Sequence, residues 1–261
     1  MKKSFGYVKA GWPPILAVFL LLLLWQGATM IFQIEDWILP SPLAIVQEGI
    51  NQAPQLGKHL LATLKITLLG FAIGSGIGLV LAFVLHSLPM IRRAIYPLLI
   101  VSQNIPTIIL APLLMIWFGF GLLPKMILIT LICFFPVTLS TMTGLAQTDP
   151  QMKRYMMMIG ANRKQIFWKL ELPNSLPSIF SGLKISATYS VMGAVISEWL
   201  GAKEGLGLYM LRAQSSFHTD RVFVTMFIIV LMSFAIFGLI TFIERRLIGW
   251  RPSNEGREGA K

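Results

Sequence analysis

The sequence predicts an all-α membrane protein with six transmembrane helices, and three observations lead to this fold class. Of the 261 residues, 55% are hydrophobic and 13% are charged, about half the charged share of a soluble domain. Apolar stretches recur along the chain, and each approaches the ~20 residues with which a helix crosses a bilayer. The basic residues, which give a net charge of +11, gather between these stretches. This distribution indicates membrane topology and anionic lipid contact, and it disfavours nucleic acid as a partner.

The first apolar stretch could also be a signal peptide, because Lys2 and Lys3 precede a run of leucines. The run continues through Trp25 to Phe32 without a small-x-small cleavage site, which favours a retained helix. The predicted spans are 14–32, 60–85, 95–118, 123–145, 179–200 and 222–243, within a membrane domain of residues 14–247. Residues 1–13 form the predicted cytoplasmic N-terminus, and residues 248–261 form a polar, disordered cytoplasmic tail.

Six spans place both termini on one face of the membrane, and the basic residues decide which face. If the termini are cytoplasmic, most of the 22 lysines and arginines lie inside, as the positive-inside rule requires. The basic residues left outside are Lys58, Lys65, Lys125, Lys203, Arg212 and Arg221. We therefore expect a multi-pass protein of the bacterial cell membrane with both termini in the cytoplasm.

Three connections between the spans are longer than turns. On the outside, Ser41 and Pro42 predict the start of a short helix that lies on the membrane surface. Residues 201–221 form a second outer connection. The longest cytoplasmic loop covers residues 148–178.

The cytoplasmic loop predicts two short helices that are joined at a glycine. Gly160 can adopt a left-handed conformation and end the first, methionine-rich helix. Asn162 can cap the second helix, and Pro173 is expected to end it. Such a knob would present apolar side chains to a partner, namely Tyr155, Met156, Met157 and Ile159. The alternative is an amphipathic loop that lies on lipid headgroups.

This loop resembles the coupling loop of permeases in binding-protein-dependent ABC importers. In that family Glu-Ala-Ala precedes a glycine by three residues, and nine variable residues that include an isoleucine lead to an apolar-x-Leu-Pro ending. The residues that fit are Gly160, Ala161, Ile166, Phe167, Leu172 and Pro173. Arg154, Tyr155 and Met156 stand in place of Glu-Ala-Ala, which leaves open the docking contact that the family's glutamate makes.

Further matches follow in order at residues 39–42, 112–125 and 196–207. The first resembles the start that follows the first helix in this family, and the other two are similar to the subgroup that imports sulfonates, taurine, nitrate and thiamine-precursor pyrimidines. The resemblance implies the type I importer permease fold of the methionine importers. It also implies three kinds of protein partner: a second copy of the chain, two ABC ATPase subunits, and an external solute-binding protein. The expected substrate is a thiamine-precursor pyrimidine such as formylaminopyrimidine or hydroxymethylpyrimidine, with sulfonates, riboflavin and nitrate as alternatives.

No Gly-x-x-x-x-Gly-Lys-Ser/Thr sequence occurs in the chain, so no phosphate-binding loop is predicted. The chain is expected to bind no cofactor, and the partner ATPase is expected to use ATP and Mg. No catalytic residue and no metal ligand is predicted, because the sequence contains no Ser-His-Asp set and no metal-ligand spacing. The rival interpretations are a membrane enzyme and an ATP-independent secondary transporter or channel. Ion-coupled transporters tend to carry ionisable residues in the membrane, and acids in mid-membrane are nearly absent here.

Polar residues in the third predicted span are the candidates for the translocation path: Ser102, Gln103, Asn104, Pro106 and Thr107. Proline leaves a carbonyl without its helical hydrogen bond, and polar groups at this depth usually face a bundle interior or a water-filled cavity. Hydrogen bonding between packed helices is the alternative role. Glu198, near the outer end of the fifth span, either gates the outer mouth or is an interfacial charge beside Lys203.

Gly70, Gly74 and Gly78 repeat at every fourth position of the second span. Small residues at this spacing allow two helices to approach closely. We therefore expect these glycines to serve in helix packing and not in substrate contact.

Overall fold

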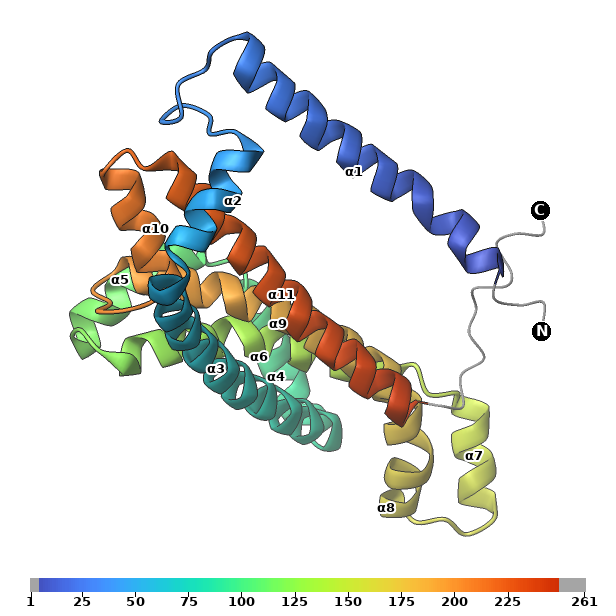
Figure 1. Cartoon of the computed structure of the whole chain (residues 1–261). Helices are drawn as coiled ribbons and strands as arrows, with labels where there is room; N and C mark the ends of the chain where they lie inside the picture. The colour runs from blue at the N-terminus through green and yellow to red at the C-terminus, as the bar shows by residue number, and fades with distance from the viewer. Residues whose placement is uncertain (1–4, 249–261) are drawn as a thin grey trace.

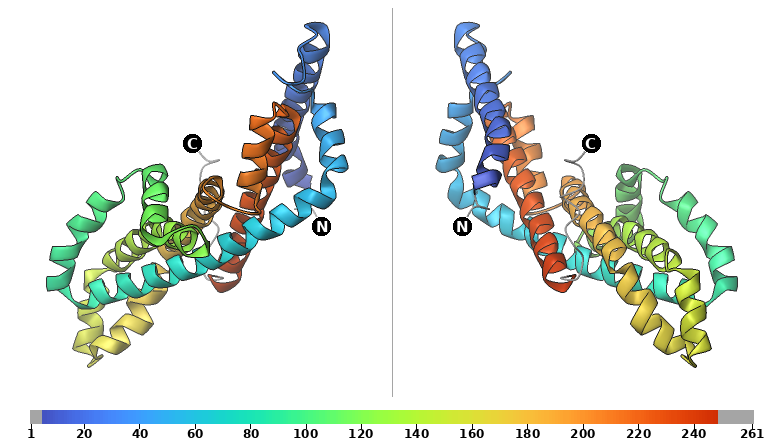
Figure 2. Two further views of the ribbon diagram at one scale, coloured as in Figure 1. Left: turned by 90° about the vertical axis from the view of Figure 1, so that its left-hand side faces the viewer. Right: turned by 90° about the vertical axis from the view of Figure 1, so that its right-hand side faces the viewer.

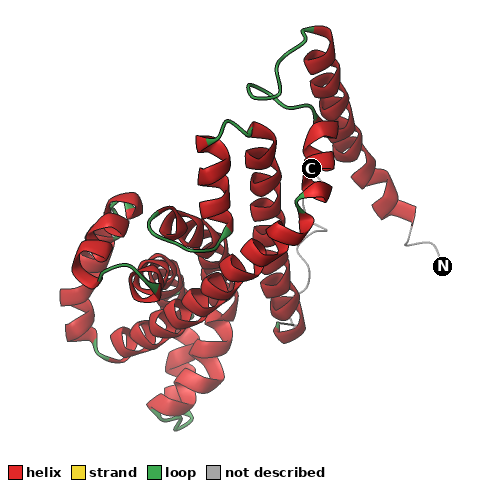
Figure 3. Cartoon of the chain, turned by 60° about the vertical axis from the view of Figure 1, so that its left-hand side comes forward, coloured by secondary structure: helices red, strands yellow, loops and turns green. Residues whose placement is uncertain are grey.

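The computed structural model describes residues 5–248, and every regular element among them is helical (Figure 3). In chain order the helices are α1 (Phe5–Ile31), α2 (Pro42–Asn51), α3 (Ala53–Ser87), α4 (Pro89–Ser102), α5 (Thr107–Phe118), α6 (Leu122–Ala146), α7 (Pro150–Met158), α8 (Arg163–Ile166), the π-helical turn η1 (Phe167–Glu171), α9 (Leu172–Trp199), α10 (Leu206–Ser215) and α11 (Thr219–Leu247). Most of the predicted tail, residues 249–261, lies outside the described residues.

The centre of the bundle consists of α3, α6 and α9, and α11 packs along α9 (Figures 1 and 2). Ile129 and Cys133 of α6 are completely buried against Ala194 of α9. Ile236 of α11 belongs to a second apolar cluster that α11 shares with α9. The bundle interior also buries hydroxyl groups, and those of Thr138 and Ser186 bond to backbone carbonyls, as expected where no water is available to solvate polar groups.

Within residues 5–248 five helices are long and apolar enough to cross a membrane, and α4 and α5, which meet at an angle of 100°, add a sixth crossing if the pair is one span. This bent pair joins the two ends of the bundle. Pro89, at the start of α4, lines the same cleft as Glu171, at the end where α7 and α8 lie. Leu122, just beyond α5, lines a cavity with Glu198 at the other end.

The stretch that was predicted as one helix over residues 95–118 is therefore two helices. Pro106 has no N–H to donate, and its ring disfavours a helical conformation at Ile105. Accordingly, α4 ends at Ser102 and α5 begins at Thr107. Residues 103–106 at this break are exposed on the surface of the single chain.

Pro173 was expected to end a helix, and this prediction was wrong. The chain stays helical from Arg163 to Trp199, with Pro173 in the first turn of α9. The turn η1 comes just before it, and the N–H of Leu172 donates to the carbonyl of Phe167, five residues back. The wider π turn accommodates a residue that cannot donate to the carbonyl four positions back.

The short helices lie at the two ends of the bundle, with α2 and α10 at one end and α7 and α8 at the other (Figure 1). Ser41 caps α2 as predicted, because its hydroxyl oxygen accepts the N–H of Ala44 at 3.2 Å. Helix α1 stands away from the rest of the molecule in Figure 1. It contacts α2, and its Trp25 ring lies 5.5 Å from that of Phe223 in α11.

Candidate functional site

Helices α7 and α8 form a hairpin that projects from one end of the bundle (Figures 1 and 2). Gly160 has a φ of 85° and ends α7 in the predicted left-handed conformation. The N–H groups of Gly160 and Ala161 donate to the carbonyls of Met157 and Met156, both at 3.0 Å, which is the Schellman pattern. Asn162 then caps α8 in a reciprocal capping box with Gln165. We call residues 150–166 the knob.

The candidate coupling residues divide into an exposed set and an anchoring set. The exposed set is Arg154, Tyr155, Met157, Ile159 and Gly160. The anchoring set is half-buried or buried: Met156, Ala161, Ile166, Phe167, Leu172 and Pro173. Met158, which the sequence interpretation did not single out, is 78% exposed. The outer surface of the knob thus exposes apolar side chains beside basic ones such as Arg154, while its other face holds the knob to the bundle.

Three ionisable side chains fasten the knob to the bundle, and the sequence interpretation missed them. Glu171 accepts from Nζ of Lys153 in α7 at 2.5 Å and lies 2.8 Å from Nε2 of His86 at the end of α3. Beside them the Phe167 ring packs edge-on against Phe83, with centroids 5.6 Å apart. The only sequence signal was an acid near the end of a basic loop whose other acid is Asp149, since His86 lies 85 positions from Glu171.

The candidate path residues lie around the break between α4 and α5. Ser102, Gln103 and Thr107 line a cavity of about 140 Å³ together with side chains of α6 and with Tyr189 of α9. Asn104 does not line this cavity, and its amide donates to the carbonyl of Ile100 at 2.8 Å. The break is exposed on the surface of the single chain. Within one chain it is therefore a lateral groove and not a closed channel.

Glu198 is completely buried at the other end of the bundle. Its carboxylate accepts from the hydroxyl of Thr63 at 2.8 Å and from the N–H of Gly207 at 2.7 Å. The Thr63 oxygen also accepts the N–H of Leu206 at 2.8 Å, and Nδ1 of His59 accepts the N–H of Gly205 at 3.0 Å.

These bonds satisfy three successive N–H groups at the start of α10, which has no other side-chain cap. We call this network the outer clamp. It ties the ends of α3, α9 and α10 together. A Cβ atom on Gly205 would lie 2.2 Å from the carboxyl carbon of Glu198, so the clamp requires glycine there.

A cavity of about 440 Å³ opens beside the outer clamp. Its lining includes Glu198, Lys125, Lys203 and Glu204. The two interpretations of Glu198 were a role in gating or supporting an outer mouth and an interfacial charge near Lys203, and the structure places it beside this cavity together with Lys203. The structure adds the hydrogen bonds that hold its carboxylate away from lipid.

The three spaced glycines of α3 lie against α6. Cβ atoms added to Gly70, Gly74 and Gly78 would come within 2.4 to 2.8 Å of α6 atoms. Gly76, between them, has no atom within 4 Å of such a Cβ. The close approach expected from the glycine spacing therefore occurs between α3 and α6.

Five or six apolar helices that are long enough to cross a membrane, with a helical knob at one end, define a multi-pass membrane protein. Residues 74–249 match the family of the binding-protein-dependent transport system inner membrane component, and the chain belongs to this family. It is a multi-pass membrane permease of an ABC importer and not an enzyme.

Curated relatives cover almost the whole chain. It is 37% identical over 253 residues to the formylaminopyrimidine transport permease protein of Halalkalibacterium halodurans, covering 96% of this chain and 99% of that protein. It is 32% identical over 248 residues to the riboflavin transport system permease protein of Chloroflexus aurantiacus, covering 93% and 92%. Identity to the taurine transport system permease protein of Escherichia coli is 28% over 237 residues, covering 88% and 86%.

Solved structures share the fold. An amino acid ABC transporter crystallised with histidines matches with a TM-score of 0.64 at 18% identity, covering 77% of this chain and 97% of that chain. The MetNI methionine ABC transporter in an inward-facing conformation matches with a TM-score of 0.61 at 21% identity, covering 76% and 97%. The predicted all-α, type I importer fold is thus confirmed.

Proposed function

We propose that this permease imports a thiamine-precursor pyrimidine that an external binding protein delivers. The 37% identity to a formylaminopyrimidine permease over nearly the full chain supports this substrate class. The riboflavin and taurine permeases share less identity. Riboflavin, aliphatic sulfonates and nitrate are therefore the alternative substrates.

The observation that carries the coupling role is the set of exposed apolar side chains on the knob. Tyr155, Met157 and Ile159 are each more than half exposed at one end of the bundle, and exposed large apolar side chains that gather on one surface favour a contact with a protein or a membrane. We propose that an ABC ATPase subunit covers this surface. That subunit binds ATP and Mg, and the knob transmits its closure to α9.

Orientation follows from the basic residues of the same region. Lys153, Arg154, Arg163 and Lys164 all belong to the knob, and basic loops remain in the cytoplasm. We therefore place the knob and both termini in the cytoplasm and the outer clamp on the external face.

The lateral position of the polar groove favours a pair of permeases. Ser102, Gln103 and Thr107 line a groove that is open on one side of the single chain. A second copy that faces it would close a path between two equivalent polar breaks. We propose a homodimer with two ATPase subunits, in which Asn104 and Pro106 shape the break and Glu198 supports the outer mouth.

The knob is tested by charge insertion on its exposed face. We expect Tyr155→Glu and Met157→Glu to prevent co-purification of the ATPase and to abolish uptake, because a carboxylate would have to be desolvated in an apolar contact. Phe217→Glu is the matched control, since Phe217 is 72% exposed at the opposite end. Normal ATPase retention in both knob variants would refute the coupling role.

The ATP-independent alternative is tested in proteoliposomes that contain the permease, its ATPase and the binding protein. Uptake of labelled formylaminopyrimidine should require ATP inside the compartment that holds the ATPase. Uptake that persists without ATP would favour a secondary transporter or channel. Parallel assays with riboflavin and taurine identify the substrate class, and a preference for either would overturn the pyrimidine assignment.

A further inference from the structure

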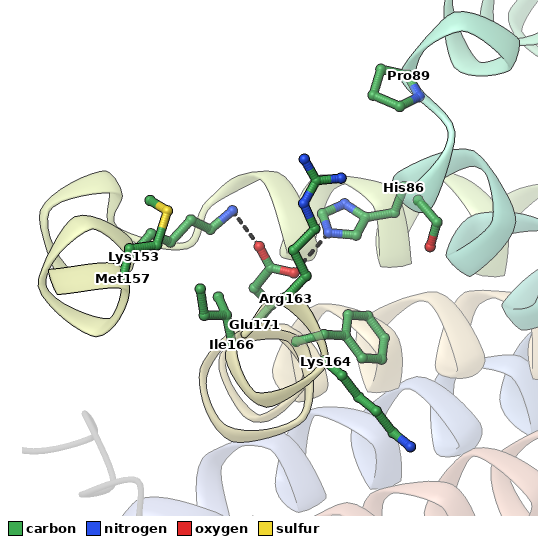
Figure 4. A pocket seen from close by; sticks show the side chains of 10 residues that line it. His86, Pro89, Lys153, Met157, Arg163, Lys164, Ile166 and Glu171 are labelled. Atoms are coloured by element: carbon green, nitrogen blue, oxygen red, sulfur yellow. Dashed lines mark hydrogen bonds and ion pairs between the residues drawn. The ribbon is translucent and has the colours of Figure 1, made fainter. Parts of the chain in front are cut away.

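A cleft of about 680 Å³ lies between the knob, the end of α3 and the start of α4 (Figure 4). Its polar lining includes His86, Lys153, Arg163 and Glu171. Figure 4 shows the side chains of His86, Lys153 and Arg163 converging on the region of the Glu171 carboxylate. Apolar side chains of the knob form the remaining wall, including Met157 and Ile166.

Positive charge exceeds negative charge in this cleft. Glu171 is the one acid among the residues that line it, and its two oxygens are already engaged by Lys153 and His86. No ion pair joins Arg163 or Lys164 to a carboxylate within residues 5–248. A neighbouring hollow that shares Pro89 adds two more guanidinium groups, those of Arg92 and Arg93.

The donors that remain suit a phosphate oxyanion. The guanidinium of Arg163 can present two parallel N–H groups to phosphate oxygens, and the ammonium of Lys153 has three N–H donors, of which Glu171 uses one. Glu171 fixes Lys153 in place, so little side-chain freedom remains to be lost on binding.

We propose that this cleft binds the phosphate headgroup of an anionic phospholipid from the cytoplasmic leaflet. The inference rests on the orientation proposed above. Basic pockets between transmembrane helices on the cytoplasmic side are suited to such headgroups, and His86 places this one at the end of a spanning helix. A bound headgroup would bridge the end of α3, the start of α4 and the knob.

The test is native mass spectrometry of the complete transporter, released from membranes of phosphatidylglycerol and phosphatidylethanolamine. We expect Arg163→Gln to weaken retention of phosphatidylglycerol about fivefold, the factor that corresponds to ~1 kcal/mol for one basic residue. Arg92→Gln should also weaken retention of phosphatidylglycerol, and it tests the proposal if the transporter with Arg163→Gln does not assemble. Arg245→Gln is the matched control, because Arg245 is an exposed arginine in the last turn of α11, outside the cleft.

Three outcomes would overturn the proposal. An equal loss in Arg245→Gln would indicate general attraction to the anionic surface. Displacement of the lipid by millimolar inorganic phosphate would indicate a site for soluble phosphate. Retention by the isolated permease but not by the complete transporter would assign the cleft to the ATPase contact. None of these measurements uses ATP or substrate, so they remain informative if the proposed import function fails.

Discussion

At the scale of single residues, the Thr63 hydroxyl is the centre of the outer clamp. It donates to Glu198 and accepts from the N–H of Leu206, both at 2.8 Å and completely buried. Thr63→Val keeps the shape and removes the hydroxyl, which leaves a buried N–H and a buried carboxylate oxygen without this partner. Because each unsatisfied buried group costs ~1–3 kcal/mol, we expect a clearly lower thermal unfolding midpoint in detergent.

Thr67→Val is the matched control for that substitution. Thr67 is equally buried one turn further along α3, but its hydroxyl donates to the carbonyl of Thr63 in the same helix. Its loss should therefore shift the unfolding midpoint much less. If the two valine variants unfold at the same temperature, the clamp contributes no more than an ordinary helical threonine.

A second prediction at this scale concerns Glu48 of α2, which joins α11 through Arg221. Burial raises the pKa of Glu48, but hydrogen bonds from Arg221 and Gln52 outweigh burial and lower its pKa below 4.5 overall. A carboxylate with a lowered folded-state pKa stabilises the fold above its unfolded pKa, and this contribution is lost as the pH falls through the folded value. We expect unfolding midpoints measured between about pH 6 and pH 3 to fall more steeply for the wild type than for Glu48→Gln. Parallel curves for the two proteins would contradict this.

At the scale of elements, the contact between α3 and α6 depends on glycine. In Gly74→Ala the new methyl would lie 2.7 Å from Cβ of Cys133 and 2.8 Å from the carbonyl oxygen of Thr130, so the helices must separate. We expect a loss of ~1–3 kcal/mol, as for overpacked cores, seen as a lower unfolding midpoint. Gly76→Ala meets no atom within 4 Å, and it should be neutral or slightly stabilising because alanine favours helices.

Prolines mark the limit of what the sequence could predict about the elements. Three predicted features depend on neighbours in sequence: the apolar stretches, the cap at Ser41 and the chain reversal at Gly160. The structure confirms all three. Whether a proline breaks a helix depends on its surroundings. Pro106 separates α4 from α5, whereas a π-helical turn accommodates Pro173 and the helix continues through it.

The site shows the same limit. Glu198 was a candidate from its position in the sequence, but its partner Thr63 lies 135 positions away. Glu171 and His86 were missed for the same reason, since 85 positions separate them. Packing of α3 against α9 and the knob brings these pairs together, and no local sequence pattern predicts such contacts.

At the scale of the whole molecule, the family match separates residues 74–249 from the N-terminal part of the chain. The family match begins at residue 74, within α3, and reaches residue 249. It therefore includes the knob, the polar break and Glu198, and it leaves α1 and α2 outside. The parts to which we assign coupling and translocation all lie in the shared portion of the chain.

Helix α1 stands apart from the bundle, and this has a consequence for its sequence. Residues 15–24 are exposed on every side of the helix, and we expect lipid to be their neighbour, so that no complementary shape selects among them. We expect a variant in which these ten residues are written in reverse order to insert and to transport as the wild type does, provided that Trp25 keeps its place. Normal insertion with lost uptake would show that another chain packs there. If the variant is active, the function of this segment depends on its length and its hydrophobicity and not on the order of its side chains.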